Sequence, residues 1–340
     1  MQNKKLSFTA LASAMVFALA ACGGGGGDEG GSDPAPTNPP VEPQPAPPTS
    51  VPPSTTAPTP TYPAGDQRLV AYETLNSLRL KLGVGVLKQD EALDRSADSH
   101  LGYMAANNVV AHEEEAGKPG FTGVNPYEQG VAAGADRAQW IAQVAGGAPD
   151  GLECALGFAN SVYHLQGITG VQETVGIAVR DNLCVINFGV ITGANGSGYG
   201  LPTWGGQQMS AGNMTYFPFD NDTVIGSFNP AAERPNPAPD LTMAGRPVMF
   251  RVPATSDADA LTVNSFTLAG PNGAAIPVRV LVAPNAKTAS AASVIEDANV
   301  VRGVAFMLPI QPLPAGVYTA TFSGARNGIP VSKTWSFTAF

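Results

Sequence analysis

The 340-residue sequence has few of the residues that usually carry catalytic chemistry. It contains three cysteines and three histidines, and charged residues make up only 13% of it. Acidic residues outnumber basic ones by 27 to 18, which gives a net charge of −9 at pH 7. Binding of nucleic acid requires clustered Lys and Arg that displace counterions from phosphates, so this composition excludes a nucleic acid as partner.

Several catalytic motifs are also missing. The sequence has no Gly-rich phosphate loop, no His-Glu-x-x-His pair and no Cys-x-x-Cys motif. Ser99 beside His100, or Ser161 near His164, could be drawn as a nucleophile with its base. Neither serine lies in the pattern of a nucleophile elbow. The sequence therefore gives no support for an enzyme.

The N-terminal residues predict export. An apolar run over residues 6–21 follows Lys4 and Lys5 and is too short to span a bilayer, which is typical of a secretory signal at residues 1–21. It ends in Leu-Ala-Ala-Cys, which resembles the lipobox of bacterial lipoproteins and implies cleavage before Cys22 and lipid attached to it. A plain signal peptide with a chance cysteine is the alternative. Gly23 after the cysteine, in place of Asp, resembles lipoproteins sorted to the outer membrane of Gram-negative cells.

Residues 22–64 predict a lipidated tether. Glycines follow Cys22, and a tract rich in Pro, Thr and Ser comes after them. This composition lacks the apolar residues needed for a core and favours an extended polyproline helix, about 90 Å long at roughly 3.1 Å per residue. A lipid anchor with such a spacer would hold a folded domain clear of a membrane.

Two cysteines remain after Cys22, namely Cys154 and Cys184. An even pair in an exported protein predicts a disulfide, because the compartment is oxidising. Two buried free thiols are the alternative.

Residues 69–190 contain both helical and strand patterns. The segments 173–180 and 183–190 are rich in Val and Ile, and Asp181-Asn182 between them is a two-residue hairpin signal. Strands that are apolar on both faces need cover on both sides, which predicts a sheet between helix layers. Apolar spacing and cap residues predict helices over residues 69–82, 91–108, from 125 onward, and 152–163.

Four segments of this region, ALDRSADSHLGYMAANNVVAH, PGFTG, FANSVYHLQGIT and ETVGIAV, resemble in order a bacterial member of the CAP superfamily. This superfamily comprises cysteine-rich secretory, antigen and pathogenesis-related proteins and is also called SCP. The resemblance covers about a third of the chain. It implies an α/β/α sandwich, which we place at residues 65–195.

The resemblance also implies a cavity in which two histidines and two glutamates can hold a divalent metal such as zinc. His112 and His164 match the two histidines by motif. Gln143 stands where many bacterial relatives have Glu, and an amide is a poorer metal ligand than a carboxylate. The second family glutamate has no evident counterpart. We therefore predict a ligand cavity with His112, His164, Gln143 and Glu114, weak metal binding at most, and Glu115 and Glu153 as other candidate acids.

The C-terminal third reads as a separate module. Residues 196–240 are predicted to be a linker and extended lead-in. Residues 241–340 contain short strand-like runs separated by turns, which predict a β-sandwich, and LPAGVYTATFSG and TWSFTAF resemble bacterial Ig-like domains. The predicted fold class is thus α+β, with a CAP-type domain followed by an all-β module.

These observations lead to one main functional hypothesis and two alternatives. The main one is a lipid-anchored cell-envelope protein, at the outer membrane on its periplasmic or surface-exposed side, whose CAP domain binds a small hydrophobic ligand or a protein partner without catalysis. The CAP resemblance supports this, since the family includes members that bind sterols or fatty acids. The first alternative is a metal-assisted hydrolase that uses His112 and His164. The second is a purely structural surface module.

Overall fold

The computed structural model describes residues 49–340, apart from residues 195, 203 and 257. The predicted signal peptide, Cys22 and most of the predicted tether lie outside these residues. The described residues form one compact unit. None of the described helices has the length and apolar character needed to cross a membrane.

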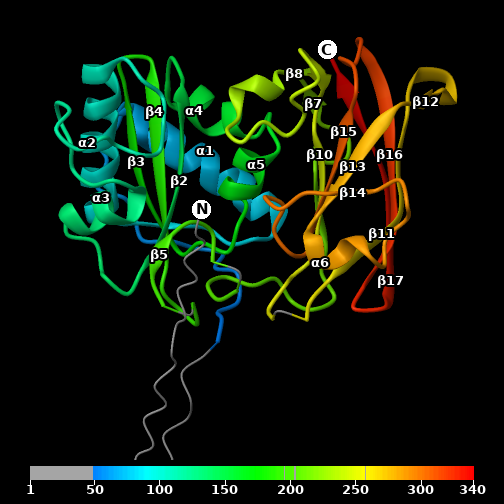
Figure 1. Ribbon diagram of the computed structural model, residues 1–340, viewed down its shortest axis with the longest axis horizontal. Helices are drawn as coiled ribbons and strands as arrows, with labels where there is room; N and C mark the ends of the chain where they lie inside the picture. Colours follow the sequence, from blue (N-terminus) through cyan, green and yellow to red (C-terminus); the bar gives the residue numbers. More distant parts are fainter. Residues whose placement is uncertain (1–48, 195, 203, 257) are drawn as a thin grey trace, which may run out of the picture. The chain divides into compact units, whose positions relative to one another are not determined.

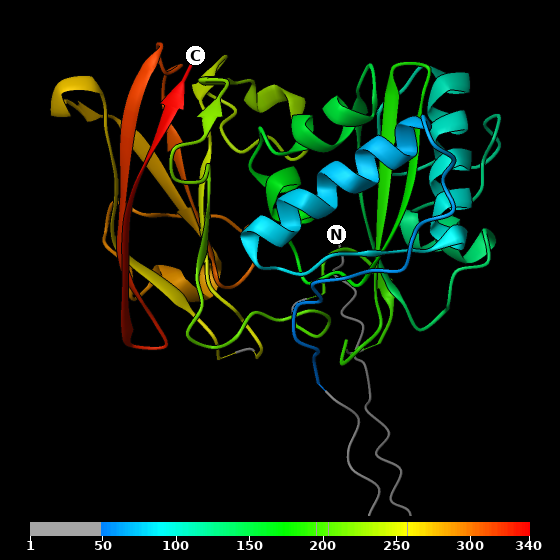
Figure 2. The same ribbon diagram turned by 180° about the vertical axis from the view of Figure 1, so that it is seen from behind.

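The first half of this unit is a sheet covered by helices on both faces (Figure 1). The sheet has the order β1 (Lys88–Gln89), β3 (Thr174–Arg180), β4 (Leu183–Val190), β2 (Trp140–Gly147) and β5 (Gly198–Tyr199). The helices are α1 (Gln67–Leu82), α2 (Glu91–Asn107), α3 (Pro126–Ala132), α4 (Gly151–Phe158) and α5 (Tyr163–Ile168). α2 and α3 lie on one face and α1, α4 and α5 on the other, as the reverse view in Figure 2 also shows. The doubly covered sheet agrees with the strands that were predicted to be apolar on both faces.

α2 illustrates how local sequence sets these elements. Asp90 caps its first turn by accepting hydrogen bonds from the backbone N–H groups of the second and third helical residues. Asn108 ends the helix in the left-handed region at φ 51°. Gly176 of β3 lets the helix approach the sheet, since a Cβ there would lie 2.1 Å from the carbonyl carbon of Leu93. The predicted apolar face is fully buried and consists of Leu93, Ala97, Leu101 and Met104.

The two central strands form the predicted hairpin. Asp181 and Asn182 both have positive φ, at 55° and 58°, as a two-residue type I′ turn requires. A disulfide joins Cys154 of α4 to Cys184 of β4, with the Cα atoms 5.6 Å apart. The bond therefore ties a covering helix to a central strand.

Two elements differ from the sequence-based expectations. The helix predicted over residues 152–163 ends earlier, at Phe158 of α4, and a second helix that was not predicted, α5, begins at Tyr163 after residues 159–162. Residues 140–147, for which no strand was predicted, form β2, which pairs along its whole length with β4.

The second half is a pair of five-stranded sheets packed face to face. One sheet has the order β14 (Ile295–Glu296), β13 (Val278–Val282), β15 (Val304–Pro309), β10 (Val248–Arg251) and β6 (Thr215–Phe217). The other has the order β12 (Ala275–Ile276), β11 (Leu261–Ala269), β16 (Gly316–Arg326), β17 (Ile329–Ala339) and β7 (Thr223–Val224). Phe250 and Phe322 stack across the interface with ring centroids 3.8 Å apart. The short strands β8 (Ser227–Phe228) and β9 (Ala244–Gly245), the 3-10 turns Pro230–Ala232 and Pro271–Gly273, and α6 (Pro284–Lys287) complete the described elements.

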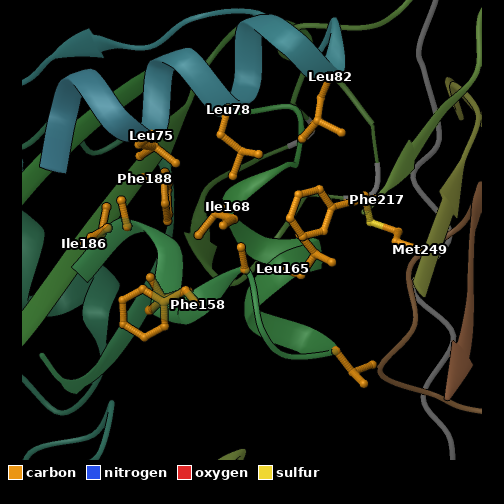
Figure 3. Close-up of a cluster of buried hydrophobic side chains, with 14 of the residues drawn as sticks. Leu75, Leu78, Leu82, Phe158, Leu165, Ile168, Ile186, Phe188, Phe217 and Met249 are labelled. Atoms are coloured by element: carbon orange, nitrogen blue, oxygen red, sulfur yellow. The ribbon is translucent and has the colours of Figure 1, made fainter. Parts of the chain in front are cut away.

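The two halves share one hydrophobic core. Phe217 of β6 and Met249 of β10 pack in the same cluster as Leu82 of α1 and Leu165 and Ile168 of α5 (Figure 3). The segment 196–240, expected to be a linker, supplies β5 to the first sheet, β6 and β7 to the two sheets of the second half, and β8. This segment therefore connects the halves by folded structure.

Candidate functional site

His112 and His164 line the same cavity, which has a volume of about 150 Å³. His112 lies in the loop after α2, and His164 is the second residue of α5. Gln143 of β2 lines the same cavity. The structure thus brings together three of the four predicted site residues. The other lining side chains with polar groups are Tyr163, Tyr199, Glu233 and Arg234.

A hydrogen-bond network fixes the state of His112. The Asn187 amide nitrogen donates to the carbonyl of Leu93 at 3.4 Å and to Ser96 Oγ at 3.1 Å. Because a carbonyl can only accept, the other end of the amide is its oxygen, which accepts from Gln143 Nε2 at 3.0 Å. The oxygen of Gln143 then accepts from Nδ1 of His112 at 2.9 Å. Burial lowers the pKa of His112 below its ordinary value, so the ring is neutral at neutral pH, with Nε2 as its unprotonated nitrogen.

His164 is held beside a buried carboxylate. Its Nδ1 lies 3.4 Å from Oε1 of Glu233, and its ring packs 5.0 Å from the ring of Phe158. Burial lowers the pKa of His164 to about 4, with a smaller contribution from the nearby His112. At neutral pH the imidazole is therefore uncharged, and its contact with Glu233 is not an ion pair despite the short distance.

Glu233 was not predicted as a site residue. Its carboxylate accepts the backbone N–H groups of Val162, Tyr163 and His164 at 2.8–2.9 Å and so caps the start of α5. Burial raises its pKa to about 6, and these three hydrogen bonds oppose the rise. The residue comes from the segment expected to be a linker, 69 positions from His164. No local sequence signal connects the two.

Glu114, the fourth predicted site residue, lies elsewhere. Its Oε1 is 2.9 Å from Nδ1 of His100, and both side chains are fully buried. Its Oε2 accepts the backbone N–H groups of Thr122 and Gly123. Nε2 of His100 contacts the carbonyl of Ala111 at 2.8 Å. Glu114 and His100 therefore hold the loop between α2 and α3 in place and do not line the cavity.

The other polar candidates do not complete a catalytic set. Ser99 is exposed, whereas both ring nitrogens of His100 are engaged inside the protein. Ser161 Oγ donates to the carbonyl of Phe158 and accepts the N–H of Leu165. Glu115 is largely exposed, and Glu153 lies on α4. Neither serine is placed as a nucleophile beside a free base.

The cavity residues do not form a multidentate metal site. Across residues 49–340, with 195, 203 and 257 excepted, no group of three or more His, Cys, Asp or Glu side chains is arranged to hold a metal ion. The carboxylate beside His164, that of Glu233, already accepts three backbone N–H groups. Two imidazoles alone fall short of the three protein ligands usual for catalytic zinc.

A larger groove lies beside α1 and α4. Its volume is about 770 Å³, and we call it the α1–α4 groove. Large apolar side chains on its surface are exposed, at 41% for Leu156, 47% for Ile225 and 66% for Phe340. Its principal apolar lining residues are Leu78, Leu156, Phe217, Phe219, Val224, Ile225 and Phe340, and its charged ones are Glu73, Lys81, Glu153, Asp222 and Arg246.

Arg246 is the buried cation of this groove. Its Nη2 donates to the carbonyl of Ala159 at 2.9 Å, and the guanidinium lies 5.2 Å from the ring centroid of Phe217. Its Nε is buried and has no hydrogen-bond partner among the described residues. Burial lowers its pKa to about 10, so the group is still charged at neutral pH. By contrast, Lys81 pairs with Asp222 at 2.9 Å.

Comparison with known proteins identifies a domain in the first half. Residues 72–181 match the family model of CAP, the cysteine-rich secretory protein family. No curated protein is found to match the sequence. The structure is similar to an extracellular SCP-domain protein from Bacillus anthracis strain Ames, with a TM-score of 0.33 and 19% identity over 36% of this chain and 39% of that one. It is also similar to PcoC, a copper resistance protein from Escherichia coli, with a TM-score of 0.21 and 13% identity over 37% of this chain and 95% of that one.

The match to the CAP family places a CAP domain at residues 72–181, the part of the chain that contains His112, Gln143 and His164. This chain spans about two fifths of the length of the Bacillus protein. With TM-scores below 0.5, neither of the two structural likenesses bears on the function of this chain.

Proposed function

We propose that this chain is an exported CAP-domain protein of the cell envelope that binds a small hydrophobic molecule in the α1–α4 groove. The observation that carries the proposal is the groove itself. Its volume of about 770 Å³ lies in the usual range for small-molecule sites, roughly 300–1,000 Å³. Leu156, Ile225 and Phe340 expose apolar surface together at its wall, which a ligand would cover.

One residue of the groove, Arg246, favours a ligand with an acidic head group. Arg246 is 5% exposed, carries an unpaired Nε and remains charged at neutral pH. A buried charged donor without a partner is costly, and a ligand carboxylate would satisfy it. An apolar chain against Phe217, Phe219 and Leu156 with a carboxylate near Arg246 fits both features. The proposed ligand class is therefore a long-chain monocarboxylic acid.

The proposed location comes from the sequence and from the disulfide. The signal-like residues 1–21, the Leu-Ala-Ala-Cys motif and the Pro-rich tract support lipid anchoring at Cys22, at the outer membrane. The bond between Cys154 and Cys184 suits an oxidising compartment. We assign the second half to an Ig-like β-sandwich, because it consists of two packed five-stranded sheets.

Ligand binding can be measured by fluorescence titration of the full chain with a fluorescent C16 carboxylic acid. We expect saturable binding that palmitate displaces. Arg246→Met should weaken it about tenfold, because a hydrogen bond to a charged group contributes about 1.5 kcal/mol or more. Leu156→Glu should also weaken it, whereas Ile329→Glu, at a 72% exposed position outside the groove, should not. Absence of saturable binding, or equal affinity in the two Glu variants, would refute the proposal.

Anchoring is tested separately by Cys22→Ala. This change should leave the folded unit intact and release the protein from membrane fractions, because a covalent lipid is the proposed attachment. Sedimentation of the two proteins with membranes, detected by immunoblot, gives the answer. A variant that still sediments like the parent would show that the protein is not held by lipid at Cys22.

A further inference from the structure

β2 has an open edge beside the cavity that contains the two histidines. On one side β2 pairs with β4 from Trp140 to Gly147. On the other side β5 pairs only with its first two residues, Trp140 and Ile141. The rest of the outer edge of β2, residues 142–147, has no strand beside it in the described part of the chain.

Two hydrogen bonds show which backbone groups point outward. The carbonyl of Ile141 accepts the N–H of Gly200, away from β4, whereas the N–H of Ala148 donates to the carbonyl of Asn182 at the turn of the β3–β4 hairpin. The N–H and C=O groups of one residue point to the same side of a strand, and the side alternates from residue to residue. Since the groups of Ile141 point away from β4 and those of Ala148 point toward it, the N–H and C=O groups of the odd-numbered residues face the open edge. These are Gln143, Ala145 and Gly147. Within the described residues, none of their backbone N–H or C=O groups takes part in a backbone hydrogen bond away from the β4 ladder.

Cavities lie along this edge. Ala142, Gln143 and Val144 line the cavity of about 150 Å³ described above. The next residues, Ala145–Ala148, line a second cavity of about 350 Å³. His164 and Glu233 line both cavities, so the two meet at these side chains. We call the combined depression the β2 cleft. No residue of β2 lines the α1–α4 groove, although Glu153, Gly157 and Asn160 line both that groove and the cavity of about 350 Å³.

The walls of the cleft are mostly uncharged, and its charged lining residues are Glu153, Glu233 and Arg234. His112 and His164 are neutral at neutral pH for the reasons given above. Aromatic and apolar side chains supply most of the remaining wall, namely Val110, Phe158, Tyr163, Phe188, Tyr199 and Phe228. The strand itself is built largely of Ala and Gly at this point, so no bulky side chain of β2 keeps another backbone away.

We infer that the β2 cleft binds an extended peptide as an added strand. A row of N–H and C=O groups two residues apart is complemented by the backbone of an extended chain, which repeats the same groups at about 6.8 Å. Five or six peptide residues cover the edge from Gln143 to Gly147. The cavities of about 150 and 350 Å³ accept side chains of the peptide, and the apolar and aromatic side chains that form most of their walls select apolar or aromatic ones.

The test uses the full chain and a positional library of N-acetylated hexapeptide amides, with affinity measured by fluorescence polarisation. We expect saturable binding of members that carry apolar or aromatic residues. Methylation of alternate backbone nitrogens of the best peptide should abolish binding in one register and spare it in the other, because only one set of N–H groups faces β2. No saturable binding, or equal binding of both methylated forms, would overturn the inference.

A variant pair tests the protein side. Gly147 is exposed, has no positive φ, and a Cβ there would come no closer than 3.7 Å to another atom, so Gly147→Ala keeps the fold and the outward N–H. Gly147→Pro removes that N–H without removing a hydrogen bond to β4. We expect the Pro variant to bind the hexapeptide at least about fivefold more weakly than the Ala variant. Equal affinities would overturn the proposed strand pairing, and the methylated peptides give the answer if the Pro variant fails to fold.

Discussion

At the scale of single residues, His164 shows how burial makes stability depend on pH. Its side chain is 18% exposed, and its pKa falls to about 4 in the folded protein. In the unfolded chain the ring has its ordinary pKa, near 6.5. Between these values the unfolded state binds a proton that the folded state does not, so stability is lost as pH falls from about 6.5 to 4.

His164→Gln should remove this dependence. The shift corresponds to about 3 kcal/mol of stability that the parent loses across this interval and the variant does not. Glu233 acts in the opposite direction, because its pKa is raised to about 6 and its contribution is lost as pH rises through 6. The free energy of unfolding of parent and variant is measured in urea at pH 7, 6, 5 and 4. The difference between the two values at each pH isolates the contribution of the histidine. If the difference in free energy of unfolding between parent and variant stays the same from pH 7 to pH 4, His164 is not buried in its neutral form.

The two residues of this contact differ in how far sequence could identify them. His164 was predicted because it lies in a motif of neighbouring residues that resembles a family motif. Glu233 approaches it through folding of a segment without periodicity, in which Gly, Pro and Asn are frequent. Its role depends on three N–H groups at the start of α5, which exist only after that helix has formed. Such a contact leaves no local pattern in the sequence.

At the scale of elements, sequence predicted best where the ends are set by nearby residues. Asn125 and Pro126 start α3, and Asp181 and Asn182 turn the β3–β4 hairpin. β2 was missed because Trp-Ile-Ala-Gln-Val-Ala-Gly-Gly is rich in small residues with weak strand preference, so its conformation depends on pairing with β4. The break between α4 and α5 was missed because the cap of α5 comes from Glu233.

The disulfide between α4 and β4 is expected to stabilise the fold by about 3 kcal/mol, because it closes a loop of about 30 residues in the unfolded chain. The double variant Cys154→Ala/Cys184→Ala should show this loss in urea unfolding. Both cysteines are fully buried, so thiol labelling should be done in urea without reductant. Labelling of both residues under these conditions would mean that the exported protein contains free thiols.

At the scale of the whole molecule, the sheet that contains β10 and β15 is buried on both faces. Phe250 and Met307 point into the β-sandwich, whereas Met249 and Phe306 belong to the core shared with the CAP domain. The hydroxyl of Thr169, next to α5, contacts the sulfur of Met249 at 3.7 Å. The apolar runs of β10 and β15 do not alternate with polar residues, a pattern that fits strands buried on both faces. The pattern does not indicate which part of the chain covers the second face.

A shared core of this kind predicts that the two halves unfold together. Inter-domain contacts that are small and polar allow separate unfolding, whereas a continuous apolar core couples its two sides. Met307→Ala tests this sharply, because Met307 is fully buried in the sandwich and belongs only to the sandwich core. The cavity left by this substitution should lower the free energy of unfolding by about 2–5 kcal/mol.

The measurement follows each half with its own probe. In a Trp140→Phe/Trp204→Phe background, fluorescence of the buried Trp335 reports on the sandwich, and far-UV dichroism at 222 nm reports on the helices of the CAP domain. We expect both signals to shift to the same lower urea midpoint, with Met249→Ala giving the same coincidence. A Trp335 transition that moves while the helix signal stays in place would mean that the halves fold as independent domains.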